Sequence, residues 1–249
     1  MRLRCIACQV LTHPLQAAVA CSPHSVDLEF VPLGQHDYPK KLREELQGRI
    51  DAVDGRGYDA VLLGYGLCGQ AMDGLKARSI PLVIPRAHDC ITLYLGSRER
   101  YQREFEDHPG TYWYTRDQLE HRTGEAAALS MGSGSDEELR NAYASHVQKF
   151  GRENADYLME VMGAWRKSYR RGVYLELSEG DSDGTIAQAE AEASRRGWTF
   201  ERYATDLRLA HELVNGGWLP AGNRDFLYVP AGGTVQTAYN ECILDTCPR

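Results

Sequence analysis

Apolar and polar positions along the first third of the chain form blocks that predict strands and helices in turn. Short apolar runs suited to buried strands lie at Arg2–Val10, Val26–Leu33 and Tyr58–Leu63. Lys40–Val53 carries leucine, isoleucine and valine at spacings of three and four, which is typical of an amphipathic helix. Another helix is predicted to begin at Pro14, since proline is favourable in a first helical turn. This rhythm predicts a parallel sheet covered by helices on both faces.

The same rhythm returns in the last third of the chain. Strand-like runs at Val173–Leu177, Thr199–Tyr203 and Phe226–Val229 alternate with helical patterns at Thr185–Arg196 and Leu207–Val214. A long stretch with helical spacing, from about residue 136 to 170, separates the two series and follows a glycine- and serine-rich loop at 124–135.

We therefore predict an α/β fold with two Rossmann-like βαβαβ lobes, parallel sheets and a long helical connection. The predicted boundaries are 1–124 for the first lobe, 125–171 for the loop and helical connection, and 172–249 for the second lobe and tail. The two halves share an order of elements, and no sequence identity between them is visible.

Four side chains with the ligand chemistry of a soft metal site follow the strand-like runs of the first lobe. Cys8 lies near the end of the first run, Cys68 follows the third, and His88 and Cys90 follow a further apolar run at Pro81–Ile84. Because ligands in parallel sheets bind beyond the carboxyl ends of the strands, we expect these side chains to converge. A tetrahedral zinc site would use them as ligands, with one position open for substrate if three bind. Iron, or an iron–sulfur cluster held by three cysteines, is the alternative.

Three further side chains at this edge are candidates for catalysis. His36 is a candidate for proton transfer, and Arg86 for catalysis and for binding a carboxylate group of the substrate. Asp89 is a third catalytic candidate and is placed to cap a helix that starts near Cys90. A helix amino terminus there would lower the pKa of the Cys90 thiol.

Two glycine-containing turns are candidates for binding an anionic substrate. Tyr65, Gly66 and Gly69 surround Cys68, and glycines there permit a close approach of the backbone to a ligand. Gly232 and Gly233 follow the last strand-like run and offer backbone amides to an anion. A plain turn is the alternative interpretation for both segments.

Composition narrows the class of protein. The 249 residues are 43% hydrophobic and 25% charged, which is ordinary for a soluble globular enzyme. No apolar run approaches the roughly 18 residues of a membrane span, and the amino terminus is typical of a strand rather than a signal peptide. The formal net charge of −7, without a basic tract, argues against a nucleic-acid partner. We expect a cytoplasmic protein that acts on small molecules, with reduced thiols and no membrane partner.

The turns around Cys68 and Cys90 contain the motifs YGLCG, at residues 65–69, and PRAHDC, at residues 85–90. Together with Leu95-Gly-Ser97 and Pro109-Gly-Thr-Tyr112, they resemble a prokaryotic family known only as a domain of unknown function. The resemblance covers most of the chain. Members of that family are often encoded beside corrinoid proteins and methyltransferases. The resemblance therefore implies a role in one-carbon or methyl-group metabolism, with a corrinoid protein or methyltransferase as a partner, and it assigns no catalytic residues.

Three hypotheses about function follow. The leading one is a metal-dependent enzyme, a transferase or lyase, that acts on a small anionic molecule with a Cys/His metal centre at the carboxyl edge of the first sheet. The second is a non-catalytic protein that binds or carries a metal or small ligand for a methyltransferase system. The third is a metal-free enzyme that uses Cys90 as a nucleophile.

Overall fold

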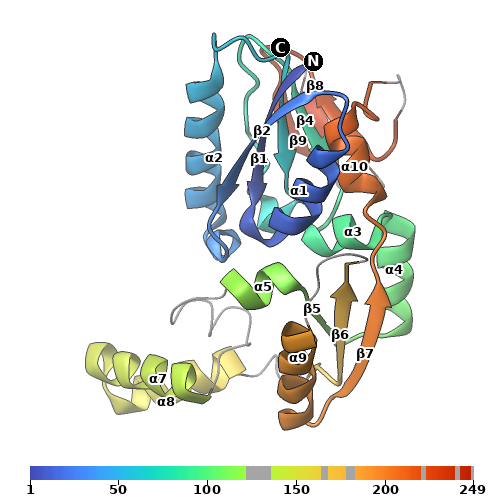
Figure 1. Ribbon diagram of the computed structural model, residues 1–249. Helices are drawn as coiled ribbons and strands as arrows, with labels where there is room; N and C mark the ends of the chain where they lie inside the picture. The colour runs from blue at the N-terminus through green and yellow to red at the C-terminus, as the bar shows by residue number, and fades with distance from the viewer. Residues whose placement is uncertain (122–135, 164–167, 178–182, 220–222, 239–241, 248–249) are drawn as a thin grey trace. The chain divides into compact units, whose positions relative to one another are not determined.

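The structure is a computed structural model, and it describes residues 1–121, 136–163, 168–177, 183–219, 223–238 and 242–247. The chain forms two compact units (Figure 1). The first contains Met1–Glu104 and Ala204–Arg249, and the second contains Phe105–Tyr203. Among the described residues, no helix has both the length and the apolar character needed to cross a membrane.

A five-stranded sheet in the order β2-β1-β3-β4-β8 forms the centre of the first unit (Figure 1). Its strands are β1 (Arg2–Cys8), β2 (Ser25–Val31), β3 (Ala60–Gly64), β4 (Leu82–Pro85) and β8 (Phe226–Val229). Strands β2, β1, β3 and β4 run parallel, and β8 runs antiparallel to β4. The predicted α/β class with parallel sheets is confirmed.

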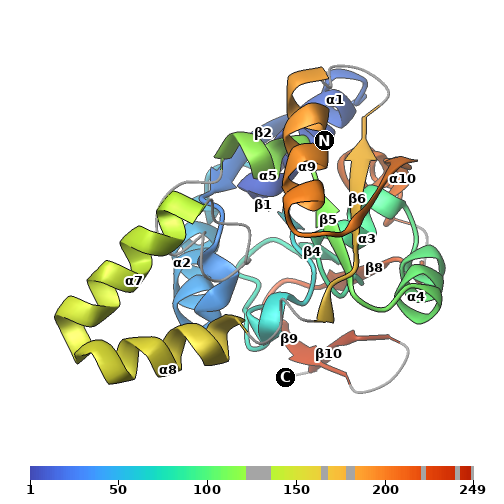
Figure 2. The ribbon, with the colours of Figure 1, turned by 90° about the horizontal axis from the view of Figure 1, so that it is seen from below.

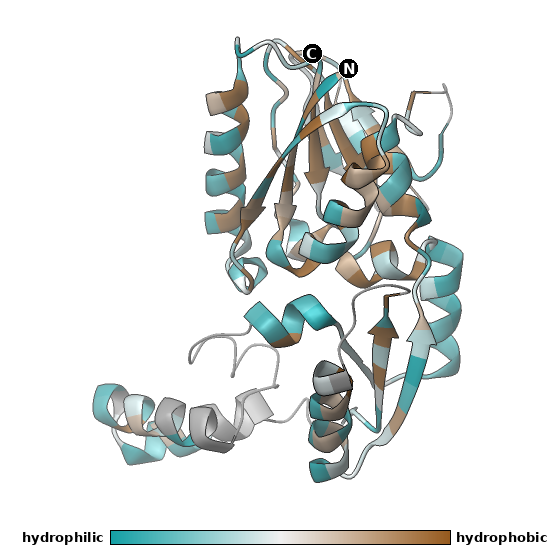
Figure 3. Cartoon of the chain, viewed as in Figure 1, coloured by the Kyte–Doolittle hydropathy of each residue, from teal (hydrophilic) through white to brown (hydrophobic). Residues whose placement is uncertain are grey.

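Helices cover both faces of this sheet. The row of leucine, isoleucine and valine on α2 (Pro39–Val53) packs on one face, against side chains that include Ile6, Leu63 and Ile84. On the other face, α1 (Thr12–Ala20) and α10 (Arg208–Asn215) lie side by side. Figure 3 shows the apolar strands between these helical layers. Each fully buried leucine of this kind contributes about 1.5–3 kcal/mol, so the amphipathic row on α2 fixes that helix on the sheet.

Short segments follow the strands at the carboxyl edge of the sheet. They include the 3₁₀ turns η1 (Gln9–Leu11), η2 (Gln35–Asp37) and η3 (Cys68–Gln70), and the helices α3 (Cys90–Leu95) and α4 (Arg98–Asp107). Ser97 caps α4 through its Oγ, which accepts the amide of Arg100 at 3.0 Å. A hairpin of β9 (Thr234–Thr237) and β10 (Leu244–Cys247) packs on the same core as α2.

The second unit has a smaller sheet, in the order β5-β6-β7. Its elements are β5 (Thr111–Tyr114), α5 (Arg116–His121), α7 (Asp136–Phe150), α8 (Arg152–Gly163), β6 (Arg171–Glu176), α9 (Asp183–Arg195) and β7 (Thr199–Ala204). Strands β5 and β6 run parallel, and their tyrosines pack with Trp198 in an aromatic core. The predicted long helical stretch is two helices, α7 and α8, joined at Gly151 with φ of 80° (Figure 2). The predicted loop at 124–135 lies outside the described residues.

The boundaries of the two units differ from the predicted lobes. The strand-helix-strand series predicted for 172–249 is divided, because β6, α9 and most of β7 belong to the second unit while α10 and β8 complete the first. Strand β8 joins the first sheet by pairing antiparallel with β4, and the Arg86 amide extends this pairing to the Asp225 oxygen at 2.7 Å. The apolar spacing of a strand indicates that it is buried, but it does not indicate which sheet the strand joins.

The first unit is continuous in space across the insertion of the second. The Asp206 amide donates to the Tyr94 oxygen at 2.9 Å, and the Arg100 guanidinium donates to the Ala204 oxygen at 3.1 Å.

We expect a chain in which a short glycine–serine linker replaces residues 105–203 to unfold cooperatively, because its sheet and both helical layers remain complete. Residues 1–124 alone lack α10 and β8 and should show no cooperative transition. Circular dichroism melts of both chains test this, and the opposite pair of outcomes would contradict it.

Candidate metal centre

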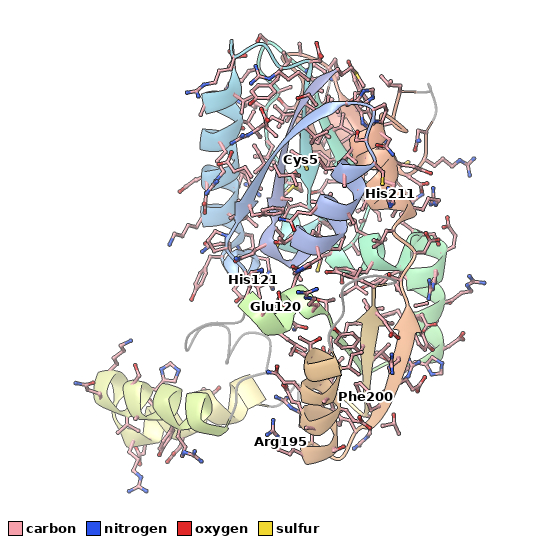
Figure 4. The ribbon with its side chains drawn as sticks, viewed as in Figure 1. Cys5, Glu120, His121, Arg195, Phe200 and His211 are labelled. Atoms are coloured by element: carbon pink, nitrogen blue, oxygen red, sulfur yellow. The ribbon has the colours of Figure 1, made fainter. Side chains whose placement is uncertain are left out.

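Cys8 and Tyr65 lie on the same face of the sheet, at the ends of two neighbouring strands. Alternate residues of a strand point to opposite faces, so Cys8 shares a face with Ile6 and Tyr65 shares it with Leu63. All four pack in the core beneath α2. Cys5 points to the opposite face within β1 (Figure 4), where complete burial raises its pKa to about 12. Cys8 is therefore the cysteine of β1 that reaches the carboxyl edge.

The turn after β3 holds Cys68 in an unusual backbone conformation. Cys68 and Gln70 have φ of 44° and 70°, in the left-handed region that favours glycine. Such a conformation costs of the order of 1–3 kcal/mol per residue and persists only where surrounding contacts enforce it. Here the amide of Leu67 donates to the Ala87 oxygen at 2.8 Å, and that of Cys68 donates to the His88 oxygen at 3.3 Å. Backbone strain of this kind concentrates at functional sites.

Gly66 allows this turn to approach the segment that precedes α3. A Cβ atom at Gly66 would lie 2.7 Å from both the Cα and the amide nitrogen of Asp89, which is closer than an ordinary contact. The amide of Gly66 also donates to the Cys68 thiol, which lowers the pKa of that thiol. Glycine is therefore required at this position for packing, whatever its role toward a substrate.

Asp89 caps α3, as its position in the sequence predicts. Its Oδ1 accepts two backbone amides of the first helical turn, at 3.0 and 3.4 Å, and its Oδ2 accepts the hydroxyl of Tyr101 at 2.7 Å. Burial raises the pKa of the Asp89 carboxyl, and these hydrogen bonds oppose that rise. Both carboxyl oxygens are thus occupied in holding Cys90 at the first residue of α3.

The thiols of Cys8, Cys68 and Cys90 converge at the carboxyl edge of the sheet. Burial raises the pKa of both Cys68 and Cys90. The charge of Cys8 would raise the pKa of Cys68 further, and the charges of Cys8 and Cys68 would both raise that of Cys90. These mutual effects indicate that the three thiols lie near one another, and each residue is partly accessible to solvent. The segments that bring them together are the end of β1, the turn η3 and the start of α3.

The pKa of Cys90 is raised, and the prediction that the helix start would lower it is wrong. Burial is the largest cause of the rise, followed by the negative charge of Asp89. The dipole of a helix of only six residues does not offset these two effects. A raised pKa keeps a thiol protonated and poorly nucleophilic at neutral pH, which disfavours a metal-free nucleophile. A coordinated metal ion reverses this balance, because coordination deprotonates a thiol.

Tyr65 presents a buried hydroxyl beside these thiols. Its Oη has no hydrogen-bond partner among the described residues. Burial raises the pKa of Tyr65, and the charges of Cys8 and Cys68 would raise it further, so the hydroxyl lies near both sulfur atoms. An unsatisfied buried hydroxyl costs about 1–3 kcal/mol, and a ligand atom at the thiols would satisfy it.

Neither predicted histidine is placed with the thiols. The ring of His88 is exposed, stacks on Tyr101 with ring centroids 6.0 Å apart, and lines a separate cavity of about 1000 Å³. His36 lies in η2, which packs on η3, and its Nε2 is 3.6 Å from Asp37 Oδ1. Neither imidazole acts on the pKa of Cys68. The structure thus brings Cys8, rather than His88, together with Cys68 and Cys90.

Arg86 anchors the carboxyl end of β4 to the hairpin. Its Nη1 donates to the Cys242 oxygen at 2.9 Å and to the Leu244 oxygen, and its Nε donates to the Phe226 oxygen at 3.4 Å. Burial lowers the pKa of Arg86. The guanidinium also lines the cavity of His88, where its predicted role in binding an anionic group can be exercised.

The predicted glycine turns are separated by the sheet. Gly69 follows Cys68 directly, at φ of 63°. Gly232 and Gly233 lie at the opposite edge, because β8 runs antiparallel to β4 and its carboxyl end meets the amino end of that strand. Their amides already donate to the oxygens of Arg78 and Pro230, at 2.9 and 2.8 Å. They cannot bind a substrate through these amides at the thiol site.

Within the part of the chain that the structure describes, no three His, Cys, Asp or Glu side chains are already arranged to hold a metal ion. The three thiols come from three separate segments, so coordination requires their side chains to rotate toward a common point. Cysteine has a single side-chain torsion before its sulfur, which makes this a local change.

Several residues around His88 were missed by sequence reasoning. Arg98 and Arg103 on α4, and Arg224 before β8, line the same cavity as Arg86 and His88. Nothing in the sequence indicates that Arg224 lies in the same cavity wall as Arg98 and Arg103.

A family model described as a protein of unknown function (DUF1638) matches residues 30–214. The matched region contains Cys68, His88 and Cys90, and Cys8 and β8 lie outside it. Searches of curated proteins and of solved structures gave no significant match.

Substitution of Gly66 tests whether the approach of the two turns holds the site. Gly66→Ala should destabilise the protein by about 1–3 kcal/mol, as expected for overpacking against backbone. Gly48→Ala is the matched control, because Gly48 lies inside α2 with nothing within 4 Å of an added Cβ. Alanine there should be neutral or stabilising by about 0.5–1 kcal/mol. Urea unfolding measures both changes, and equal stabilities of the two variants would contradict the packing described for Gly66.

Proposed function

The chain belongs to DUF1638, a family of proteins of unknown function. Because the family supplies no activity, we propose a function from the residues of the site. The proposed function is that of a metal-dependent enzyme acting on a small anionic molecule, with Cys8, Cys68 and Cys90 as the metal ligands. One observation supports the proposal: three thiols from separate segments lie near one another at the carboxyl edge of a parallel sheet, where α/β proteins bind ligands.

The donor set fits a soft metal. Three thiolates suit a zinc ion with one open position, or an iron–sulfur cluster with one open iron. We place zinc first, because it needs no ligand besides the three thiolates and a water or substrate. When bound, the metal would act as a Lewis acid that activates a substrate thiol, a water or a methyl-accepting group. A bound cation would stabilise the thiolate forms of these thiols, whose pKa burial otherwise raises.

The surrounding residues have separate roles in the proposal. The Tyr65 hydroxyl donates a hydrogen bond to the ligand at the thiols, where no described residue now accepts it. Gly66 and Asp89 fix the backbone of Cys68 and Cys90. Arg86 orients an anionic group of the substrate, and His36, in the loop packed on η3, is the candidate for proton transfer.

The second candidate function is a non-catalytic carrier of a metal or small ligand in a methyltransferase system. The partial accessibility of all three thiols favours it, because a carrier must release its cargo to a partner. A corrinoid protein or a methyltransferase is then the partner, and one-carbon or methyl-group metabolism is the setting. Turnover by the purified protein with candidate methyl donors supports the enzyme, whereas metal or ligand transfer without turnover supports the carrier.

Metal analysis of protein purified without oxygen tests the ligand set. We expect one metal centre per chain, with the occupancy reduced roughly tenfold or more in Cys8→Ser, Cys68→Ser and Cys90→Ser, because each removes one of three ligands. Cys21→Ser and Cys247→Ser are matched controls at exposed cysteines, and they should keep full occupancy. Occupancy should fall as the pH is lowered, since protons compete for thiols whose pKa is raised.

Two outcomes would overturn the proposal. Full occupancy in the Cys68→Ser, Cys90→Ser double variant would show that the metal binds elsewhere. Rapid alkylation of Cys90 at neutral pH in a protein that binds no metal would favour the cysteine nucleophile instead. A visible absorption band from sulfur-to-iron charge transfer would replace zinc with an iron–sulfur cluster and leave the ligand set unchanged.

A further inference from the structure

Four arginines are among the described residues that line a cavity beside the thiol site. Its volume is about 1000 Å³, and Arg86, Arg98, Arg103 and Arg224 contribute to its wall. Among the described residues that line it, Glu99 supplies the one carboxylate. We call this the arginine cavity. The whole chain carries a formal net charge of −7, so the positive charge at this cavity is opposite in sign to the net charge of the protein.

The four arginines come from three segments that are far apart in the sequence. Arg86 follows β4, Arg98 and Arg103 lie on α4, and Arg224 precedes β8. The antiparallel pairing of β8 with β4 brings Arg224 to the same edge as Arg86. Like charges gathered in this way repel each other, and the charge of Arg98 adds to burial in lowering the pKa of Arg86. A bound anion would relieve this repulsion.

Two of these guanidinium groups are available to a ligand. Arg103 and Arg224 are exposed, and among the described residues neither side chain makes a hydrogen bond or an ion pair. Arg86, by contrast, is held by the carbonyl oxygens of Cys242 and Leu244. The cavity wall therefore contains one guanidinium group that is held in place by hydrogen bonds and two that are able to bind a ligand.

We propose that the arginine cavity binds a small molecule with two or more anionic groups, as a phosphate ester or a polycarboxylate does. Guanidinium groups match phosphate and carboxylate oxygens in bidentate geometry, and several of them at once select a polyanion over a monoanion. The volume suits a small molecule of cofactor or substrate size. The exposed ring of His88, already stacked on Tyr101, offers a planar surface to the rest of the ligand.

The cavity and the thiols share the segment 86–90. Arg86 and His88 line the cavity, and the backbone oxygen of His88 accepts the amide of Cys68 at 3.3 Å. A polyanion held by Arg103 and Arg224 therefore lies next to the thiol site. Its assignment as the substrate rests on the function proposed above, whereas its binding does not depend on a metal.

Calorimetry on chelator-treated, metal-free protein tests the proposal, with pyrophosphate, citrate and acetate at constant ionic strength as probes. We expect pyrophosphate or citrate to bind and acetate not to bind, and the preferred probe identifies phosphate or carboxylate as the recognised group. The double variant Arg103→Ala, Arg224→Ala should weaken binding roughly tenfold or more, because it removes the charge-assisted hydrogen bonds of two guanidinium groups to the anion. Both side chains are exposed and make no described contact, so folding should be unaffected.

The double variant Arg56→Ala, Arg195→Ala is the matched control. It removes the same charge from two exposed positions, and neither residue is among those that line the cavity. Its affinity for the probe should stay within about twofold of the unmodified protein. Equal weakening in the two double variants, or no binding of pyrophosphate and citrate, would overturn the proposal. Metal content is measured in the same variants as purified, before treatment with chelator. Loss of polyanion binding with full metal occupancy would show that the arginines act on the polyanion and not on the metal centre.

Discussion

The close approach of the Gly66 backbone to Asp89 is the constraint on which the site depends. It exists because glycine has no Cβ, and it lets the turn after β3 share hydrogen bonds with the segment after β4. Cys68 is thereby held in a left-handed conformation, and Cys90 is held at the start of α3. Neither cysteine lies within a strand, so their positions depend on this contact between two turns and on the Asp89 cap.

Asp89 connects the thiol site with the arginine cavity. One of its oxygens caps the helix that begins with Cys90, and the other accepts the hydroxyl of Tyr101 on α4. The ring of Tyr101 stacks on His88, which lines the cavity, and α4 also carries two of the cavity's arginines. A ligand that displaces α4 would therefore disturb Asp89, which caps α3 and positions Cys90. The two proposals of metal binding and polyanion binding concern neighbouring parts of one structure.

The sequence predicted those features that depend on local pattern. The amphipathic row of α2 and the cap at Asp89 both follow from spacing and side-chain chemistry within a few residues, and both are present. The ends of parallel strands also predicted that Cys8 would lie near Cys68. These arguments need no knowledge of how distant segments pack.

Features that depend on packing between distant segments could not be predicted from the sequence. The direction of β8 decides that Gly232 lies away from the thiols and that Arg224 lies near Arg86, and no local pattern encodes it. The outward direction of the His88 ring is set by Tyr101, thirteen positions along. The pKa of Cys90 depends on burial, which here outweighs the helix dipole that the sequence does reveal.

The most direct test of the account is X-ray absorption at the edge of the metal in anaerobically purified protein. The fine structure counts the atoms bound to the metal and distinguishes sulfur from nitrogen. If the three thiols coordinate a metal, three protein sulfur atoms will lie at the distance typical of metal–thiolate bonds, about 2.3 Å for zinc. No imidazole nitrogen will be bound. A first shell of nitrogen and oxygen, or one with the scattering pattern of histidine, would contradict the convergence of Cys8, Cys68 and Cys90 on a metal.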